Sequence, residues 1–493
     1  MAFSTSTYLG IDLGTTALKC IITDHKQCVV GLAEVALAIS RPRPGWSEQN
    51  PQDWWLALQR ACKMLRARNR KEWGRIAAIG LSGQMHGAVV LDAAGRVLRP
   101  AILWNDSRAG AEAAMFNGKF SDIGQIAGVP AVAGFTAPKL IWLQAHEPRI
   151  YKQLAMVLAP KDYLRFRMSG DFITDPCDAS GMSLLDVAER KWSPALVEAA
   201  GIRLENLPRI DEGPIASAHL RKPAADFLGL PPGLPIAAGA GDAAASAIGI
   251  GAITDGDGFI SLGTSAQYFV TTKSFRPRPQ QMIQALGHGL PGLWYQVAAL
   301  LNGASPLSWL NGILPGGNIQ KLLQRSQRRY EGAGGILFLP YLNGERTPHN
   351  DPSARAAFHG LHAGATQEDL AIAVLEGVAL SLADCQEVLE RSGTRVAELL
   401  VAGGGTRSAF WMQMLANVLN RRITIPAGSD VGAAFGAARL ARLSVTAETI
   451  AEVCRKPEVL LHLEPTQKLS KAYADRLGDF RALYGALKGI QHV

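Results

Sequence analysis

The sequence predicts an α/β fold made of two related halves, and three observations lead to it. The chain has 493 residues, which is enough for two or three domains with full hydrophobic cores. Apolar stretches of strand length alternate with segments of helical periodicity. The pattern Ile-x-Leu-Gly-Thr-(Thr/Ser) occurs twice, at residues 11–16 and 260–265, so each half offers the same strand and turn.

The two Gly-Thr turns are suited to hold one anionic ligand between them. Glycine lets the backbone approach a ligand closely, and hydroxyl and N–H groups donate hydrogen bonds to anionic oxygens. Only the first turn follows an acid, Asp12. A carboxylate beside a phosphate is explained if a metal ion lies between them, which makes Asp12 a candidate metal ligand. An ordinary hairpin turn is the alternative for either copy taken alone.

The composition is that of a globular enzyme with a preference for anionic ligands. Lys and Arg number 50 against 42 Asp and Glu, a formal charge of +8. The densest basic group, residues 66–75, falls at the end of a predicted helix and is typical of a solvated face, so we expect no nucleic-acid partner. No apolar run has the length of a membrane span and no signal pattern opens the chain, which predicts no membrane partner and a cytoplasmic location.

The six cysteines form no C-x-x-C pair and suggest no metal site. Cys20 and Cys28 could face each other across a hairpin, but without an export signal we expect reduced core residues.

The first half is expected to begin as a three-stranded meander. Further along, Thr136 is predicted to cap a helix, and residues 216–230 are predicted to form a peripheral connection. Strands are predicted at residues 8–11, 18–23, 29–35, 75–81, 87–91, 101–103, 156–158 and 234–238, and helices after residues 53, 136, 160 and 242.

Polar side chains gather where several of these strands end, which is where α/β sheets hold ligands. Gln84 and His86 follow the strand at 75–81, and Asn105 follows the strand at 101–103. Amide, imidazole and carboxylate groups that converge in this way favour a hydroxyl-rich ligand. His86 alone is equally explained as a buried imidazole with satisfied hydrogen bonds. Asp242, at the start of a helix of small residues, is a candidate general base or a structural N-cap.

The second half repeats the alternation of strands and helices. Residues 403–408 follow a strand with three glycines, which makes a backbone surface for a flat or anionic group. Strands are predicted at 267–270, 336–339 and 399–402, and helices from Ser305, from the cap Thr366 to Arg391, from Asp430, and over the amphipathic tail 466–488.

Three functions are compatible with these motifs. Phosphoryl transfer from ATP to a hydroxyl uses both Gly-Thr turns and both acids, although the chain has no G-x-x-x-x-G-K-[ST] loop. A nicotinamide oxidoreductase is suggested by residues 234–245, but the acid expected about 20 residues later is missing. A non-catalytic ATP switch of actin-like build would not need the polar loops around Gln84 and Asn105.

Taken together, the motifs resemble the FGGY family of carbohydrate kinases, and within it the kinases of xylulose. The segments that carry the resemblance keep the family's order over nearly the whole chain: residues 11–16, 82–87, 103–106, 134–140, 241–242, 261–265, 344–348 and 403–408. The resemblance implies two actin-like (ribonuclease-H-like) domains, 1–245 and 246–445, with ATP and sugar in the cleft between them and a helical tail at 446–493. A homodimer is common in the family.

The resemblance also implies a reaction, MgATP with D-xylulose giving D-xylulose 5-phosphate, and a role for each matching residue. Asp242 is the expected base, and Asp12 is expected to act with magnesium. The expected sugar contacts are Gln84, Met85, His86, Asn105 and Asp242, and the expected ATP contacts are Thr15, Thr16, Gly263, Thr264, Gly303, Gly404, Gly405 and Ser408.

Two positions depart from the family pattern. Ala243 stands where xylulose kinases usually have an asparagine that helps to hold the sugar, so another ketopentose or a pentitol is an alternative substrate. Asn417 stands where the family often has aspartate, beyond the predicted nucleotide turn, and puts little in doubt.

Overall fold

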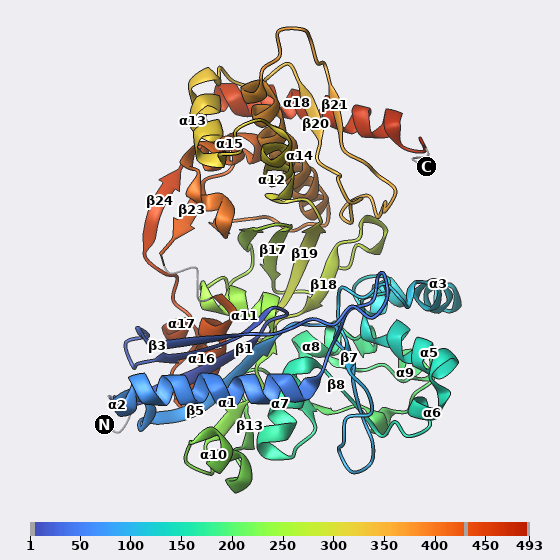
Figure 1. The fold of residues 1–493 in the computed structure, drawn as a ribbon, viewed down its shortest axis with the longest axis vertical. Helices are drawn as coiled ribbons and strands as arrows, with labels where there is room; N and C mark the ends of the chain where they lie inside the picture. Colours follow the sequence, from blue (N-terminus) through green and yellow to red (C-terminus); the bar gives the residue numbers. More distant parts are fainter. Residues whose placement is uncertain (1–4, 428–431, 491–493) are drawn as a thin grey trace.

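The computed structural model describes residues 5–427 and 432–490 as two lobes, each built on a seven-stranded sheet (Figure 1). Residues 1–4 of the predicted first domain, the predicted helix start at Asp430 and residues 491–493 of the predicted tail lie outside the described residues.

The first sheet begins with the predicted meander. Its strands lie in the order β13-β14-β5-β1-β2-β3, and β15 also pairs with β5. The meander is antiparallel, whereas β5 runs parallel to β1, and β14 and β15 run parallel to β5. The bounds are β1 (Thr7–Leu13), β2 (Ala17–Thr23), β3 (Val29–Ala36), β5 (Ile76–Gly83), β13 (Ala216–His219), β14 (Pro235–Ala237) and β15 (Ala240–Gly241). The peripheral connection predicted at 216–230 was wrong at its start, because β13 closes the edge of this sheet beside β14.

The second sheet repeats this arrangement, which confirms the two related halves. Its order is β18-β19-β17-β16-β22-β23-β24, with β16, β17 and β19 antiparallel and β22 and β23 running parallel to β16. The bounds are β16 (Asp257–Leu262), β17 (Ala266–Thr272), β18 (Gln284–Gly287), β19 (Trp294–Leu300), β22 (Glu398–Ala402), β23 (Ile423–Pro426) and β24 (Val459–Leu463). The sequence analysis did not anticipate β18, β19, β23 or β24.

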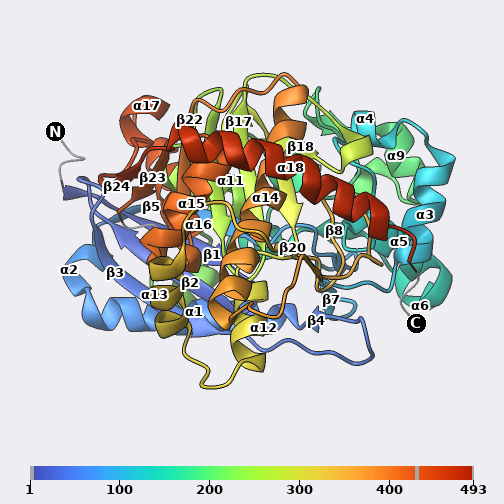
Figure 2. The ribbon, with the colours of Figure 1, turned by 90° about the horizontal axis from the view of Figure 1, so that it is seen from above.

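The remaining elements surround the two sheets (Figures 1 and 2). In the first half these are α1 (Pro51–Arg68), α2 (Arg70–Trp73), α3 (Gly110–Lys119), α4 (Ile123–Ile126), α5 (Thr136–His146), α6 (Pro148–Tyr151), α7 (Pro160–Ser169), α8 (Pro176–Ser180), α9 (Pro194–Ala199) and α10 (Lys222–Leu228), with β4 (Glu48–Gln49), β6 (Val89–Leu91), β7 (Ala101–Ile102), β8 (Met156–Leu158), β9 (Ile173–Thr174), β10 (Leu185–Asp186), β11 (Lys191–Trp192) and β12 (Arg209–Ile210). In the second half they are α12 (Ser305–Ile313), α13 (Ile319–Arg329), α14 (Gln367–Arg391), α15 (Ala409–Leu419), α17 (Ile450–Val453) and α18 (Gln467–Leu487), with β20 (Leu337–Leu339) and β21 (Ala357–His359).

Two helices of small residues, α11 (Asp242–Gly249) and α16 (Gly432–Leu443), lie between the two sheets (Figure 1). One hydrophobic cluster joins alanines of both helices to Phe259, Phe269 and Tyr295 of the second sheet. Other residues of α16 pack on the inner face of the first sheet, against Tyr8 and Ile21. The outer face of the first sheet is covered by α1, α7 and α10, and that of the second by α14 and α15. The helical layer therefore joins the two halves.

Glycines allow this layer to approach its neighbours closely. A Cβ atom placed on Gly436 of α16 would lie 1.8 Å from the carbonyl oxygen of Ala245 in α11. A Cβ atom on Gly80 of β5 would lie 1.9 Å from the carbonyl oxygen of Ala437. These contacts are backbone against backbone, so a side chain at either glycine would force the helices or the sheet apart.

Two predicted helix caps had different outcomes. Thr366 caps α14 as predicted, and its hydroxyl accepts from the backbone N–H of Asp369 in a capping box. Thr136 was wrong as a cap: the helix begins with it, Phe135 is the N-cap residue, and the Thr136 hydroxyl donates instead to the carbonyl of His86. Tertiary contact with the loop after β5 decided this side chain's role.

All six cysteines are free; the expectation of a reduced core residue is confirmed for Cys20, which is buried, and was wrong for Cys28, which is exposed. Cys20 lies opposite Ala33 in the ladder, whereas Cys28 is exposed in the turn before β3.

We predict opposite effects of one substitution at two helical glycines. Gly436→Ala should lower the free energy of unfolding by about 1–3 kcal/mol because of the clash with Ala245. Gly478→Ala in α18, where a Cβ meets no atom within 4 Å, should be neutral or raise stability by up to about 1 kcal/mol through helix propensity. Urea unfolding of the two variants measures the difference, and equal effects would contradict the close packing of α11 and α16.

Candidate active site

Three neighbouring parallel strands bring the predicted acids and the predicted sugar loop to one edge of the first sheet. In the register of β1 and β5, Asp12 lies opposite Ser82; in that of β15 and β5, Gly241 lies opposite Gly83. Gln84, Met85 and His86 follow β5 directly, and Asp242 follows β15. Neighbouring strands are about 4.8 Å apart, so these side chains share one small region.

The two acids at this edge repel each other's ionised form. Burial, opposed by the neighbouring Ser82 hydroxyl and the charge of Lys19, raises the pKa of Asp12 to about 6. Burial and the charge of Asp12 raise the pKa of Asp242 to about 7. The Asp242 side chain accepts from the backbone N–H of Ala243 at 2.8 Å. The pair is therefore suited to receive a cation, a proton, or both.

His86 is held as a neutral acceptor. Its φ of +67° is in the left-handed region, its ring stacks on Phe135 with centroids 4.2 Å apart, and Nδ1 lies 2.7 Å from the carbonyl oxygen of Gly181. Burial lowers the pKa of His86 to about 3, so the ring is neutral. Because a carbonyl oxygen can only accept, Nδ1 carries the proton and Nε2 is the acceptor nitrogen, which suits a sugar hydroxyl.

Gln84 lies in a hydrogen-bonded chain that the sequence analysis did not anticipate. Its carbonyl oxygen accepts from the hydroxyl of Thr15 at 3.0 Å, and its amide nitrogen donates to Gln49 at 3.1 Å. The indole of Trp104 donates to the Thr15 hydroxyl at 2.9 Å, and the amide of Gln49 donates to the Thr15 carbonyl at 2.8 Å. The side chain of Gln84 is only 2% exposed. These hydrogen bonds connect the first Gly-Thr turn to the loop that contains Trp104 and the expected sugar contact Asn105.

Other side chains complete the region near the two acids. Thr16, in the first Gly-Thr turn, is exposed. Asn105, which follows Trp104, is also exposed. Met85 is buried, and its sulfur accepts from the hydroxyl of Tyr295, 3.7 Å away, on β19 of the second half. The charge of Arg346 contributes to lowering the pKa of His86, so this guanidinium also lies nearby. Tyr295 and Arg346 had no role assigned from the sequence, since only the fold brings the second half against the first.

The second Gly-Thr turn is hydrogen-bonded to the segment that contains Gly303, another predicted ATP contact. The backbone N–H of Gly303 donates to the carbonyl of Thr264 at 3.0 Å, and that of Ala304 to the carbonyl of Gly263 at 2.7 Å. A Cβ on Gly303 would lie 2.4 Å from the carbonyl oxygen of Ser265, so no side chain fits there. The start of α12 is thereby fixed against the turn.

The triple-glycine turn stands beside it. The strands β16 and β22 are parallel neighbours, with Ser261 opposite Ala402, so the turns that follow them emerge side by side. A Cβ on Gly404 would meet no atom within 4 Å, whereas one on Gly405 would meet the side chain of Leu262. Ser408 is the N-cap of α15 and accepts from the N–H of Trp411 at 3.2 Å. Gly404 thus offers open backbone toward a ligand.

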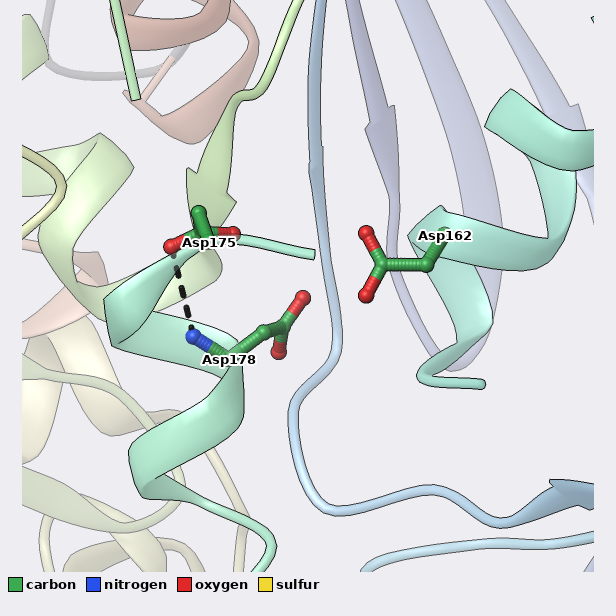
Figure 3. A group of neighbouring side chains, drawn as sticks. All are labelled: Asp162, Asp175 and Asp178. Atoms are coloured by element: carbon green, nitrogen blue, oxygen red, sulfur yellow. Dashed lines mark hydrogen bonds between the residues drawn. The ribbon is translucent and has the colours of Figure 1, made fainter. Parts of the chain in front are cut away.

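A buried ionic cluster lies behind the first sheet's ligand edge. Figure 3 shows Asp162 from α7 facing Asp175 and Asp178 at the start of α8, with one ligand atom of each within 4.8 Å of the others. The ammonium of Lys161 lies 2.5, 2.7 and 3.1 Å from the three carboxylates, and Arg165 lies 3.0 Å from Asp162. All five side chains are fully buried. The lysine therefore takes the place that a metal ion would need.

The cluster fixes the segment that supports the sugar loop. Its formal charge is one negative unit if all groups ionise, and burial raises the pKa of both Asp175 and Asp178. The helix α8 contributes Asp178 to the ion cluster and Ser180 to a contact with the second half. The Ser180 hydroxyl accepts from the N–H of Gly287 at 2.9 Å. One residue further on, Gly181 accepts the His86 hydrogen bond.

For a metal ion, Asp12 is the better ligand. Its Oδ1 is buried and has no hydrogen-bond partner among the described residues. A hard carboxylate oxygen with a free lone pair beside a phosphate-binding turn is what Mg²⁺ prefers.

Comparison with known proteins identifies relatives of nearly the whole chain. Residues 7–249 match the N-terminal domain of the FGGY family of carbohydrate kinases, and residues 258–445 match its C-terminal domain. The xylulose kinase of Escherichia coli K12 is 41% identical over 482 residues, covering 97% of this chain and 99% of that protein. The xylulose kinase of Klebsiella pneumoniae is 40% identical over 484 residues, covering 98% and 99%. A crystal structure titled as a "xyloylose kinase" from Brucella ovis is 42% identical, covers 98% of this chain and 100% of its own, and superposes with a TM-score of 0.95.

These similarities confirm the α/β fold of two actin-like domains. No helix among residues 5–427 and 432–490 is long and apolar enough to cross a membrane.

We predict that Lys161→Met lowers the free energy of unfolding by about 3–5 kcal/mol, because it leaves three buried carboxylates with Arg165 alone. The loss should be smaller at pH 5 than at pH 8, since protonation relieves the repulsion. Thermal unfolding with and without EDTA is the control: EDTA should leave the wild-type midpoint unchanged. A midpoint that depends on a divalent metal in Asp12→Asn, which lacks the proposed magnesium ligand, would contradict the lysine-centred cluster.

Proposed function

The chain belongs to the FGGY family of carbohydrate kinases, and from this we propose that it transfers the γ-phosphoryl group of ATP to D-xylulose, giving D-xylulose 5-phosphate and ADP. The observation that carries the proposal is the meeting of Asp12, Asp242 and neutral His86 at one sheet edge, in a chain with xylulose kinase relatives over nearly its whole length. ATP is the co-substrate of the family.

In this proposal Asp242 accepts the proton of the attacking hydroxyl. A base is most effective when its pKa lies near the working pH, and burial together with Asp12 holds the pKa of Asp242 at about 7. Its hydrogen bond from the N–H of Ala243 fixes the carboxylate at the start of α11. The hydroxyl oxygen then forms its bond to the γ-phosphorus as the bond from phosphorus to the β-bridging oxygen breaks.

The sugar contacts proposed are Met85, His86 and Asn105, with Asp242 at the reacting hydroxyl. Nε2 of His86 accepts from a hydroxyl, and the stack on Phe135 fixes the ring. Gln84 was also expected to contact sugar, but its side chain already bonds Thr15 and Gln49, so we propose that it positions the phosphate turn.

The ATP contacts proposed are backbone and hydroxyl groups of the two turns: Thr15, Thr16, Gly263, Thr264, Gly303, Gly404, Gly405 and Ser408. The orphan oxygen of Asp12 supports it as a magnesium ligand, directly or through water. Bound Mg²⁺ would neutralise charge on the phosphates. Closure of the two halves would exclude water, which competes with the sugar as acceptor.

Three further expectations stay predictions. They are the division of the chain into domains at 1–245 and 246–445 with a tail at 446–493, a cytoplasmic location, and a homodimer. The two family-model regions end at residue 249 and begin at residue 258, close to the proposed division after residue 245.

We predict that Asp242→Asn reduces turnover about 10²–10⁴-fold and raises thermal stability at pH 8. The folded pKa of about 7 lies above the usual 3.8, so in the wild type the free energy of unfolding falls as pH rises from about 4 to 7. The asparagine removes that loss, and the gain in unfolding midpoint over wild type should shrink toward pH 4. Near-normal turnover would contradict the assignment of Asp242 as the base.

We predict that sugar-stimulated ADP release from MgATP is highest with D-xylulose among pentuloses, pentitols, hexuloses and glycerol. The substitution Ala243→Asn should lower the KM for D-xylulose about ten- to a hundredfold, because it adds one hydrogen bond in a buried site. The measurement is a coupled ADP assay of both proteins against each sugar. Preference for another sugar would keep the kinase and overturn the substrate, whereas no stimulation by any sugar would overturn the proposed reaction.

A further inference from the structure

One segment of the family resemblance, residues 344–348, has no role in the reaction proposed above, although it lies beside the candidate sugar site. It belongs to the connection between β20 and β21. The buried carboxylate of Glu345 accepts from the backbone N–H of Leu301 at 2.7 Å and from that of Arg346 at 2.8 Å. The backbone that carries Arg346 is therefore fixed against the segment that follows β19.

A series of contacts brings this connection to His86. The hydroxyl of Thr347, the residue after Arg346, donates to the carbonyl of Met282 at 3.1 Å. Met282 packs with Phe135 of the first half in one small hydrophobic cluster. Phe135 in turn stacks on the ring of His86, with centroids 4.2 Å apart. The two halves therefore meet here, with Arg346 on one side and His86 on the other.

The guanidinium of Arg346 makes no hydrogen bond or ion pair with any of the described residues. The side chain is accessible to solvent, yet the protein around it desolvates the charge and lowers the pKa of Arg346, with Glu345 opposing. Its charge contributes to lowering the pKa of His86 and is not among the groups that shift the pKa of Asp242, so it lies on the His86 side of the site. An accessible cation without a protein partner is suited to a ligand group that accepts hydrogen bonds.

The chemistry of a 2-ketopentose supplies such a group. In the ring form of this sugar the oxygen at C5 is bonded to C2, so only the open-chain form has the hydroxyl that is phosphorylated. That form also has a free carbonyl oxygen at C2, which accepts hydrogen bonds and donates none. As the base, Asp242 accepts, and so does Nε2 of His86, so neither matches the carbonyl, whereas a guanidinium only donates.

We propose that Arg346 binds the C2 carbonyl oxygen of the open-chain ketopentose and thereby selects a ketose over the corresponding pentitol. The inference rests on the proposed function and names the feature of the substrate that the site recognises. The guanidinium donates to the carbonyl while Nε2 of His86 accepts from a neighbouring hydroxyl of the sugar. A pentitol has a hydroxyl at C2, and its hydrogen needs an acceptor that Arg346 does not supply.

The first test compares Arg346→Met with Arg346→Lys and with a matched control, Arg355→Met. The guanidinium of Arg355, on the same connection, donates to the carbonyls of Pro352 and Ala354. Arg346→Met should raise the KM for D-xylulose about 10–100-fold with kcat within about threefold, because a charge-assisted hydrogen bond is lost away from the reacting hydroxyl. Arg346→Lys, which keeps a donor, should recover about half of this loss on a logarithmic scale. Arg355→Met should match wild type, and the unfolding midpoint of Arg346→Met should not fall, since no protein contact of the guanidinium is lost.

The second test is competition by xylitol, which carries a hydroxyl in place of the carbonyl at C2. Its inhibition constant should change by less than about threefold in Arg346→Met. An equal change for both compounds would overturn the carbonyl contact. A lower kcat and a higher KM for ATP, with the KM for D-xylulose unchanged, would place Arg346 on the phosphates and also overturn it. Either result leaves the kinase in place, whereas a wild type that phosphorylates no ketopentose would overturn the proposed function itself.

Discussion

The parallel pairing of β1, β5 and β15 is the constraint on which the rest of this structure depends. It brings segments from residues 12, 84 and 242 to a single sheet edge, although they are far apart in the chain. The same pairing sets Asp12 close enough to Asp242 for its charge, together with burial, to raise the pKa of Asp242. A site with two acids that resist ionisation together is unfavourable for the empty protein and favourable for binding a cation, which is the condition that phosphoryl transfer requires.

Around this edge, the candidate reactive groups are held in place by contacts with other residues of the protein. The ion cluster around Lys161 fixes α8, the carbonyl of Gly181 next to α8 fixes the tautomer of His86, and Phe135 fixes the plane of its ring. The chain from Gln49 through Gln84 to Thr15 does the same for the first turn. Side chains locked in this way lose little freedom when a ligand binds, so geometry is set before the reaction begins.

The two halves are joined by the layer of α11 and α16, where the close backbone packing leaves no room for a larger side chain at Gly436. The helices α11 and α16 approach each other and the first sheet at backbone distance, and Asp242 is the first residue of α11. The proposed base therefore stands in the layer that joins the two halves. The second half also contributes Tyr295 and Arg346 near the sugar loop, so both halves take part in the candidate site.

The sequence by itself determined the two-fold repeat, the long capped helix α14, the Gly-Thr turns and the family, because these rest on local patterns of apolar spacing, turn residues and caps. It placed Thr136 at a cap and gave no partner within the protein for Gln84, since a local pattern does not show which distant partner a polar side chain reaches. Only the tertiary structure decided that Gln84 bonds Thr15, that Thr136 bonds the carbonyl of His86, and that β24 forms an exposed edge. Hydrogen bonds and strand order between segments many residues apart depend on how the whole chain packs, and no window of sequence contains that information.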